Sequence, residues 1–405
     1  MPGLVVGSPP RGGDYFGQDS FVDTLWERLD KGNVLLAAPR RFGKTGAMFQ
    51  LLDEPREGFR AIYIDVEGIP TAADFMVELL AALLRDQHFS RIVRGIWKGT
   101  KGFSDFLRDL PSSIDVGGVK IALRERTPVA ESWQTYGEQV MSALSQEDPR
   151  LLLIIDEFAE MASAIHQEQG RDELARFLRW FRAARTDPKT RTRFLLGSSV
   201  NLLDTLDGFG MVETVNDLKV EELRPFTPAI ANRFVEEIFA GRGEPLDNRV
   251  RDTILDLVGT PIPYLLAVLL TAIFDRRRAS HADNVTVEMV HEAFEDDLLG
   301  GATAATFQHY RSRLDRYYER DESRAARILL NTLSRADNGI TQESAYQLFL
   351  QTTTMNAGLD AQEAFLRLMN KLKNDFYIIV RAERYQFYSR VLGAWWKARY
   401  GFFGG

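Results

Sequence analysis

The chain contains no cysteine, and only five histidines occur among its 405 residues. Without cysteine it cannot form disulfides, use a thiol nucleophile or bind zinc through thiolates. The histidines are scattered without the spacing of metal ligands, at His88, His166, His281, His291 and His309. The composition therefore predicts no structural metal site.

A long hydrophobic run and an export signal are also missing. The longest apolar stretch, Tyr264 to Phe274, is too short to span a bilayer. The segment from Met1 to Gly13 is rich in Gly and Pro and has no apolar centre. These absences predict a cytoplasmic protein without a membrane partner. The formal net charge is −7, so any contact with DNA must be local rather than spread over the chain.

The most informative segment that is present runs from Ala38 to Gly46. It follows a short apolar run, Val34 to Ala37, and precedes a sequence that permits a helix. It matches the phosphate-loop pattern Gly-x4-Gly-Lys-[Ser/Thr], with Ala38 in place of the first glycine. Backbone N–H groups and a helix N-terminus bind phosphate in such loops, although a loop can also carry Gly and Lys by chance. The residues predicted to bind nucleotide are Pro39, Arg40, Arg41, Phe42, Gly43, Lys44, Thr45 and Gly46.

A second motif strengthens this interpretation. Five apolar residues, Leu151 to Ile155, are typical of a strand buried in a parallel sheet, and Asp156 and Glu157 follow directly. Ligands of α/β sheets bind beyond the carboxyl ends of the strands. We therefore expect Lys44 to contact the β- and γ-phosphates of ATP, Thr45 and Asp156 to bind Mg2+, and Glu157 to polarise water. The alternative for the acidic pair is a helix cap after a core strand.

The length predicts two or three domains. Strands at about 33–37, 61–66, 151–155 and 193–197 alternate with helices and indicate an α/β core over 1–225, built on a parallel sheet. One helix is expected over 71–94, and 95–131 is interpreted as an insertion with a short strand at 119–123. Helices at about 228–239, 247–258, 262–274 and 286–299 predict an all-helical lid over 226–305.

Residues 306–405 are expected to form a winged helix-turn-helix. Helices at 323–335, 341–351 and 361–373 precede strands at 376–380 and 385–388 and a last helix at 390–400. Residues 371–400 carry seven basic and two acidic side chains, a net charge of +5. This permits DNA contacts by Arg367, Asn370, Lys371 and Lys373, but winged helices also bind proteins. Trp395 and Trp396 are expected in the core.

Two further sets of polar residues each have two possible interpretations. Ser198 and Ser199 follow the strand at 193–197 and could sense the γ-phosphate, or they could form a turn. Arginines recur at three-residue steps in the helix predicted over 171–185. They could be a solvated face, or Arg185 could reach a nucleotide in a neighbouring subunit. The stripe consists of Arg176, Arg179, Arg182 and Arg185.

Taken together, the motifs resemble the archaeal-type ATPase family, in the STAND class of AAA+-related P-loop ATPases. The resemblance rests on Phe16-Gly17, Pro39 to Thr45, Ile155 to Phe158, Gly197 to Ser199, Leu223 to Phe226 and Gly259 to Pro261. It implies that Phe16 and the lid, with its Pro261 turn, flank the adenine. It also implies that Glu157 is the catalytic base and that Ser198 or Ser199 is the sensor. Ala38 and Gln18 depart from the family pattern.

Three functions follow as hypotheses. The first is a slow ATPase switch, whose bound ATP or ADP controls a winged-helix interaction domain and which could assemble into oligomers on ATP binding. The second is a DNA-binding AAA+ ATPase that acts in replication, transposition or regulation. The third is a scaffold that binds nucleotide without hydrolysis, against which the intact Glu157 argues.

Overall fold

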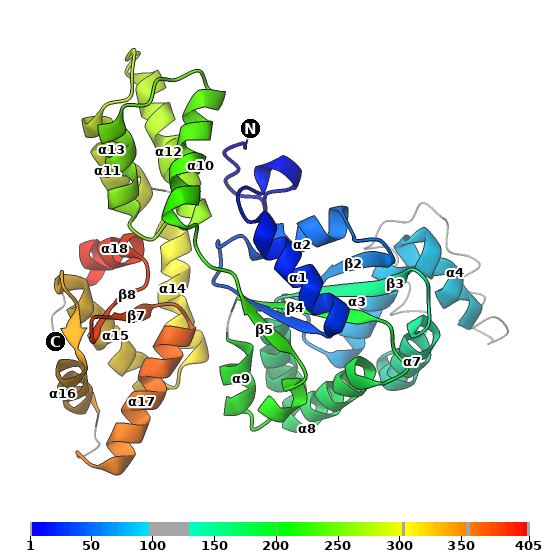
Figure 1. Ribbon diagram of the computed structural model, residues 1–405. Coiled ribbons are helices and arrows are strands. Elements are labelled where there is room, and N and C mark those ends of the chain that lie inside the picture. The colour runs from blue at the N-terminus through cyan, green and yellow to red at the C-terminus, as the bar shows by residue number, and fades with distance from the viewer. Residues whose placement is uncertain (1, 97–128, 200, 302–303, 354–356, 403–405) are drawn as a thin grey trace. The chain divides into compact units, whose positions relative to one another are not determined.

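A computed structural model describes residues 2–96, 129–199, 201–301, 304–353 and 357–402. The chain separates into two compact units (Figure 1). The sheet unit comprises Gln18–Arg224, and the helical unit comprises Met1–Gly17 together with Pro225–Gly405. Most of the insertion expected at 95–131, including its strand at 119–123, lies outside the described residues.

The sheet unit is built on five parallel strands in the order β2-β3-β4-β1-β5. The strands are β1 (Val34–Ala37), β2 (Phe59–Asp65), β3 (Arg150–Asp156), β4 (Arg193–Ser198) and β5 (Lys219–Glu222). The helices are α1 (Asp19–Lys31), α2 (Lys44–Asp53), α3 (Ala72–Arg85), α4 (Gln87–Ile96), α7 (Val129–Leu144), α8 (Phe158–Thr186) and α9 (Leu202–Gly208). A 3-10 turn spans Val212–Val215. The predicted α/β core with a parallel sheet is confirmed.

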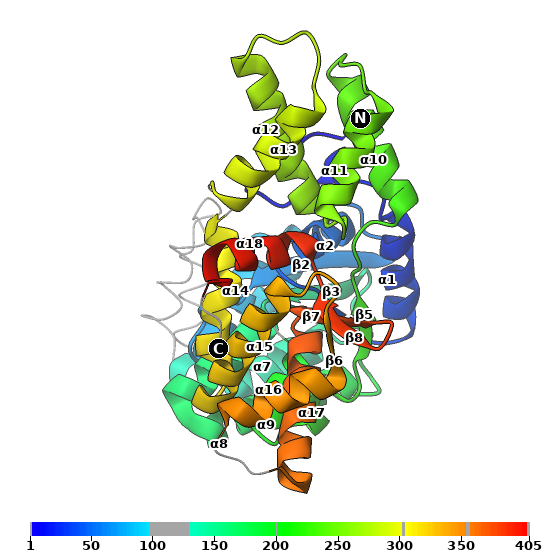
Figure 2. The same ribbon diagram turned by 90° about the vertical axis from the view of Figure 1, so that its left-hand side faces the viewer.

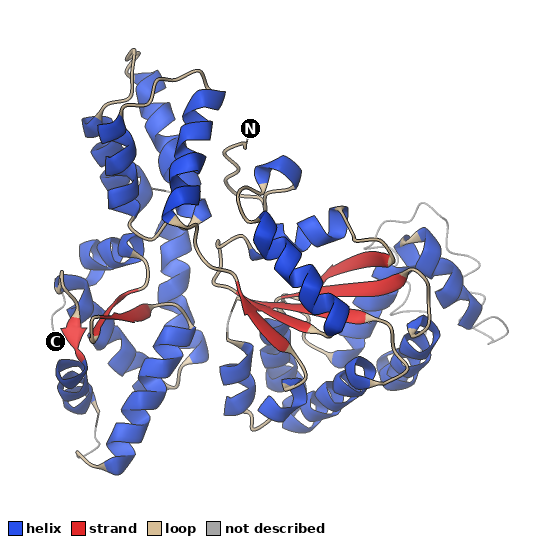
Figure 3. Ribbon diagram, viewed as in Figure 1, coloured by secondary structure: helices blue, strands red, loops and turns tan. Residues whose placement is uncertain are grey.

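Helices cover both faces of this sheet (Figure 3). Helices α1 and α2 lie on one face, and α7 and α8 lie on the other. Every residue from Leu151 to Ile155 is buried in β3, as expected for a central parallel strand. Phe177 and Phe181 of α8 stack at 5.9 Å, and Phe181 meets Phe194 of β4 edge to face. This aromatic core fixes the strand ends at which the two sequence motifs lie.

Two features of the sheet unit differ from the sequence predictions: one strand was missed, and one predicted helix was wrong. Strand β5 was not predicted, because its sequence Lys-Val-Glu-Glu lies at the sheet edge and is largely exposed, so no apolar pattern marks it. The single helix expected over 71–94 is interrupted at Asp86, whose backbone is extended. The Asp86 carboxylate accepts from the N–H groups of His88 and Phe89 and thereby caps a second helix.

The helical unit contains nearly all of the second half of the chain. Its helices are α10 (Pro228–Gly241), α11 (Asn248–Val258), α12 (Pro263–Ala279), α13 (Val287–Glu292), α14 (Ala304–Tyr317), α15 (Arg320–Arg335), α16 (Gln342–Thr352), α17 (Leu359–Asn374) and α18 (Arg390–Tyr400). A 3-10 turn at Gly12–Asp14 and a π-helix at Ala293–Leu299 complete its helical segments. Its strands are β6 (Ile340–Thr341), β7 (Ile378–Arg381) and β8 (Arg384–Phe387). Within the described ranges, no helix is long and apolar enough to cross a bilayer.

The division into units differs from the three domains expected at 1–225, 226–305 and 306–405. The N-terminal segment joins the helical unit, because Phe16 packs against Phe226 and Phe234 with ring centroids 6.2 and 5.4 Å apart. The lid and the C-terminal region share one unit as well. The Thr260 hydroxyl donates to the Tyr388 carbonyl at 2.8 Å, and so links the lid turn to the end of the β-hairpin. Such contacts are long-range and leave no local sequence pattern.

The C-terminal region combines α15 to α18 with an antiparallel sheet in the order β6-β8-β7 (Figure 2). Helices and strands occur where the winged-helix prediction placed them, and β6 is an additional short strand. Trp395 and Trp396 are 1% and 0% exposed, which confirms that they belong to the core. The assignment as a winged helix stays a prediction.

The hairpin between β7 and β8 offers a test of its turn chemistry. Ala382 and Glu383 both have positive φ, at 47° and 60°, although such turns favour Asn-Gly. We expect Ala382→Asn combined with Glu383→Gly to raise the free energy of unfolding by about 1 kcal/mol. Ala and Glu are strained at positive φ, whereas Asn and Gly tolerate it. Urea unfolding of both proteins measures the difference. The change Ala336→Asn with Asp337→Gly is a matched control, and equal stability of parent and hairpin variant would contradict the prediction.

Candidate functional site

The loop between β1 and α2 has the backbone of a phosphate cradle. Gly43 caps α2 with φ of 99°, a conformation that L side chains rarely adopt, and Lys44 begins the helix. Arg41 also has a positive φ, 73°, which is uncommon for a non-glycine residue and concentrates at functional sites. The N–H of Ala38, the residue that replaces the usual glycine, donates to the Ser198 carbonyl at 3.3 Å. The loop is therefore anchored to the end of β4.

Strand β4 lies between β1 and β3, yet the two sequence motifs meet across it. The Thr45 hydroxyl donates to Asp156 Oδ2 at 2.9 Å. Lys44 Nζ bonds to Asp156 Oδ1 and, at 2.9 Å, to Glu157 Oε1. Thr45 and Asp156 thus place two hard oxygen atoms side by side, which is the donor type that Mg2+ prefers.

Glu157 is held by a second set of contacts. Glu157 comes directly after the buried strand β3 and is the N-cap residue of α8, with a positive φ of 60°. Glu157 Oε2 accepts from the Ser199 hydroxyl at 2.7 Å and from the Ser199 N–H at 3.2 Å. Ser199 is therefore in contact with the carboxylate, whereas Ser198 contributes its carbonyl to the loop.

The site is buried, and its one ammonium is shared by two carboxylates. Lys44, Asp156 and Glu157 are 5%, 2% and 8% exposed. Burial opposes the charge on Lys44, but Asp156 and Glu157 outweigh it and raise the pKa of the ammonium. Burial likewise opposes the charge on Glu157, but Lys44 and the Ser199 hydrogen bond lower the pKa of that carboxyl overall. Both groups are therefore charged at neutral pH.

Two neighbours of this network, Tyr63 and Glu67, were missed by sequence reasoning. Tyr63 of β2 points its hydroxyl at Asp156 Oδ2, 3.4 Å away, and Glu67, beyond the end of β2, pairs with the predicted loop residue Arg40. The sequence shows that Tyr63 lies between two apolar residues in a predicted strand. It does not show that β2 lies next to β3, because strand order cannot be read from strand sequences.

The suggestion that Arg185 acts on a neighbouring subunit is wrong for this structure. Its guanidinium is buried and pairs with both carboxylate oxygens of Asp217, at 2.9 and 3.0 Å, and with the Thr214 carbonyl at 2.7 Å. Arg185 therefore ties α8 to the segment before β5. The alternative of a solvated face describes Arg176 and Arg179, which are largely exposed.

Phe16 and Pro261 belong to the helical unit, whereas the phosphate loop belongs to the sheet unit. The two are linked through Phe226, whose ring packs on Phe16 and whose N–H donates to the Pro261 carbonyl at 3.1 Å. The Arg233 guanidinium lies over the Phe16 ring, 4.9 Å from its centroid. Adenine binding by Phe16 and Pro261 stays a prediction.

Gly197 of β4 gives a test of the metal site. A Cβ there would lie 2.6 Å from Asp156 Oδ1 and 2.2 Å from Met48 Cε, so it must displace both the carboxylate and the Met48 side chain. We expect Gly197→Ala to lower the apparent affinity for Mg2+ by about 10- to 100-fold, because Asp156 is a predicted Mg2+ ligand. Changes in the surroundings of a metal ligand usually have an effect of this size. A Mg2+ titration of ATP turnover measures this. Gly208→Ala, at a position with no atom within 4 Å of the added Cβ, is the control, and an unchanged titration in Gly197→Ala would contradict the assignment.

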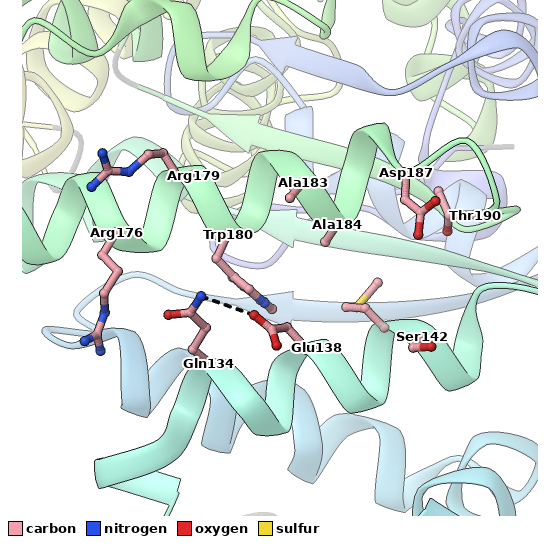
Figure 4. A pocket seen from close by; sticks show the side chains of 11 residues that line it. Gln134, Glu138, Ser142, Arg176, Arg179, Trp180, Ala183, Ala184, Asp187 and Thr190 are labelled. Carbon is pink, nitrogen blue, oxygen red and sulfur yellow. Dashed lines mark hydrogen bonds between the residues drawn. The ribbon is translucent and has the colours of Figure 1, made fainter.

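A separate hollow of about 470 Å³ lies between α7 and α8 (Figure 4). Met141 and Trp180 contribute apolar surface to its lining, and Gln134 donates to Glu138 one turn along α7 at 3.2 Å. Arg176, at one end, is already paired with Glu173 at 3.0 Å. Residues 38–46 do not line this hollow, and we assign no ligand to it.

Comparison with known proteins shows which solved structures share this fold. No protein-family model and no curated protein matches the sequence. Among solved structures, the chain resembles the Walker-type ATPase PABY2304 of Pyrococcus abyssi, with 15% identity, a TM-score of 0.63, and coverage of 97% of this chain and 99% of that one. It also resembles the Aeropyrum pernix ORC2 protein in its ADPNP–ADP complexes, with 13% identity, a TM-score of 0.52, and coverage of 98% and 97%. At these identities the likeness establishes the fold: the chain has the P-loop ATPase fold of the AAA+ type.

Proposed function

We propose that the chain binds ATP and Mg2+ at residues 38–46 and hydrolyses the ATP slowly. Its nucleotide state would control the arrangement of a winged-helix interaction domain at about 306–405. The observation that carries this proposal is the convergence of Lys44, Thr45, Asp156, Glu157 and Ser199 into one buried network at the strand ends. The printed descriptions of the two similar structures, a Walker-type ATPase and a complex with ADPNP and ADP, support it.

Each side chain has a role that its position supports. The loop N–H groups and the start of α2 would hold the β- and γ-phosphates, and Lys44 would leave its carboxylate partners to contact them. Thr45 and Asp156 would bind Mg2+, which neutralises phosphate charge. Glu157, kept ionised by its surroundings, would take a proton from the attacking water, while Ser199 positions its carboxylate.

The proposed switch would act through this hydrogen-bond network. Lys44 is bonded to both carboxylates, and Glu157 is bonded to Lys44 and Ser199. ATP must exchange these bonds for bonds to phosphate, so binding changes the contacts of the residues at the ends of β3 and β4. A ligand shifts a conformational equilibrium only through such differential contacts. In the STAND-like arrangement that the sequence resembles, the lid, with Phe16 and Pro261, would read this change.

Binding by parent and Lys44→Ala tests the proposal. We expect the parent to bind ATP and the variant to lose about 10- to 100-fold in affinity, because a charge-assisted hydrogen bond to phosphate disappears. Isothermal titration measures the affinity, and Lys189→Ala, in an exposed loop, is the control. Size-exclusion mass with and without ATP and Mg2+ tests ATP-dependent assembly. A parent that binds no ATP would refute the proposal.

A second candidate is a DNA-binding ATPase, which the net charge of +5 over residues 371–400 favours. Several of these basic groups already have partners within the chain. Lys371 pairs with Glu322 at 3.0 Å, Lys397 pairs with Asp337 at 3.3 Å, and Arg384 donates to the Gly339 carbonyl. Exposed Arg367 and Lys373 are better placed for DNA, so the test is salt-dependent DNA binding that Arg367→Glu with Lys373→Glu abolishes.

A further inference from the structure

The outer face of α17 carries a line of exposed side chains at coiled-coil spacing. The line consists of Leu359, Glu363, Leu366, Asn370 and Lys373, at alternating steps of four and three residues, and we call it the α17 stripe. Every member is exposed, with Leu359 and Leu366 at 69% and 47%. The opposite face of the helix packs inward through Phe365, Leu368, Met369 and Leu372. The stripe is therefore additional to the face that holds α17 in its own unit.

Single exposed leucines on a protein surface need no explanation. Here two leucines lie one heptad apart on one line, which is the pattern of a seam between two helices. Asp360 and Glu363 lie in the first half of α17, whereas Arg367 and Lys373 lie in the second half. If α17 paired in parallel with α17 of a second copy of the chain, like charges would lie together. An antiparallel pair instead places the acidic half of one helix against the basic half of the other.

From this self-complementary pattern we propose that α17 pairs antiparallel with α17 of a second copy of the chain. Leu366 lies on the two-fold axis against Leu366 of the second copy. Glu363 then lies opposite Asn370 and beside Arg367 of the second copy. The contact is isologous, because the same patch serves both copies. It needs no nucleotide, so it stands apart from the proposed ATPase function.

The stripe fits a second copy better than it fits DNA. Leu366 occupies its centre with the carboxylate of Glu363 beside it, and a carboxylate is repelled by phosphates. Lys371, which would help a phosphate contact, turns instead to Glu322 and lies over the Tyr318 ring, 4.3 Å from its centroid. One helix pair is a small interface, so the dimer is weak and concentration-dependent.

Sedimentation equilibrium without nucleotide, over about 1 to 300 µM chain, tests the proposal. We expect the parent to pass from monomer to dimer and Leu366→Glu to raise the dissociation constant about 30-fold or more, since the substitution acts at the centre of the contact. Leu366 is exposed, and circular dichroism verifies that the variant is folded. Glu343→Lys, on the exposed side of α16, is the control and leaves the constant unchanged.

A charge exchange makes the test specific for the antiparallel arrangement. Glu363→Lys and Arg367→Glu each weaken the dimer, and the double variant restores it, because unlike charges face each other again across the axis. A parent that stays monomeric, a dimer that survives Leu366→Glu, or a double variant no tighter than the single ones overturns the proposal. Salt-dependent binding of duplex DNA that Leu366→Glu abolishes, by a monomeric parent, would assign the stripe to DNA instead.

Discussion

Replacing Glu157 by glutamine is expected to reduce ATP turnover by about 10²- to 10⁴-fold while ATP binding survives, because an amide cannot accept a proton from water as a carboxylate does. The two side chains have the same shape, so the substitution adds no steric strain to the buried site. The amide oxygen can still accept one of the bonds that Lys44 and Ser199 now donate, at 2.9 and 2.7 Å. The loss is therefore specific to the chemical step.

Phosphate release at saturating ATP measures turnover, and equilibrium titration with ATP and Mg2+ measures binding. Because Lys44 loses one charged partner in Glu157→Gln, we expect ATP affinity to be unchanged or higher. Glu168→Gln, on the exposed face of the same helix, is the matched control and retains parental turnover. Equal turnover in parent and Glu157→Gln would favour a scaffold that holds nucleotide without using this carboxylate.

Much of this site could be predicted, because its two motifs are local and the rules of parallel sheets bring strand ends together. Lys44, Thr45, Asp156 and Glu157 were each expected from short segments, and the structure places them in contact. Ser199 was one of two candidates, and only the backbone geometry after β4 separates it from Ser198.

The features that sequence reasoning missed depend on distant residues. Arg185 has the helical spacing of a surface arginine, but it is buried, and Asp217, on a later segment, accepts from its Nε and Nη2. Phe16 precedes the sheet unit in sequence, yet its ring packs with Phe226 and Phe234 of the helical unit. Neither partner can be identified from the pattern around the residue itself.

The largest stability effect is expected at a buried ion pair in the helical unit. Arg313 of α14 and Asp375, directly after α17, are 2% and 4% exposed. Arg313 Nη2 donates to Asp375 Oδ1 at 3.3 Å, and the Tyr318 hydroxyl donates to Asp375 Oδ2 at 2.8 Å. Burial opposes the charge on Arg313, but Asp375 outweighs it, so the pKa of the guanidinium is raised rather than lowered. The arginine is therefore charged beside its partner. Without the partner it still stays charged, because the guanidinium is too basic to lose its proton.

Asp375→Leu should lower the free energy of unfolding of the helical unit by about 3–5 kcal/mol, since it leaves that charge buried without a partner. Arg313→Met with Asp375→Leu should recover most of the loss, because no charge remains inside. The recovery is incomplete, since the Tyr318 hydroxyl still lacks its acceptor. Hydrogen exchange of α14 and α17 in urea measures both variants. Asp275→Asn, in the exposed pair with Arg278, is the control and should cost at most about 0.5 kcal/mol.

The comparison of single and double variants decides what the pair contributes. If the double variant is as unstable as Asp375→Leu, the attraction itself stabilises the unit, and the prediction is wrong. If it recovers, the pair adds little net stability, and its effect is geometric: it specifies where the end of α17 lies against α14. A switch that moves an interaction domain as one body needs such fixed contacts within that domain. The pair would then hold the α17 stripe in one orientation relative to α14, whichever partner the stripe binds.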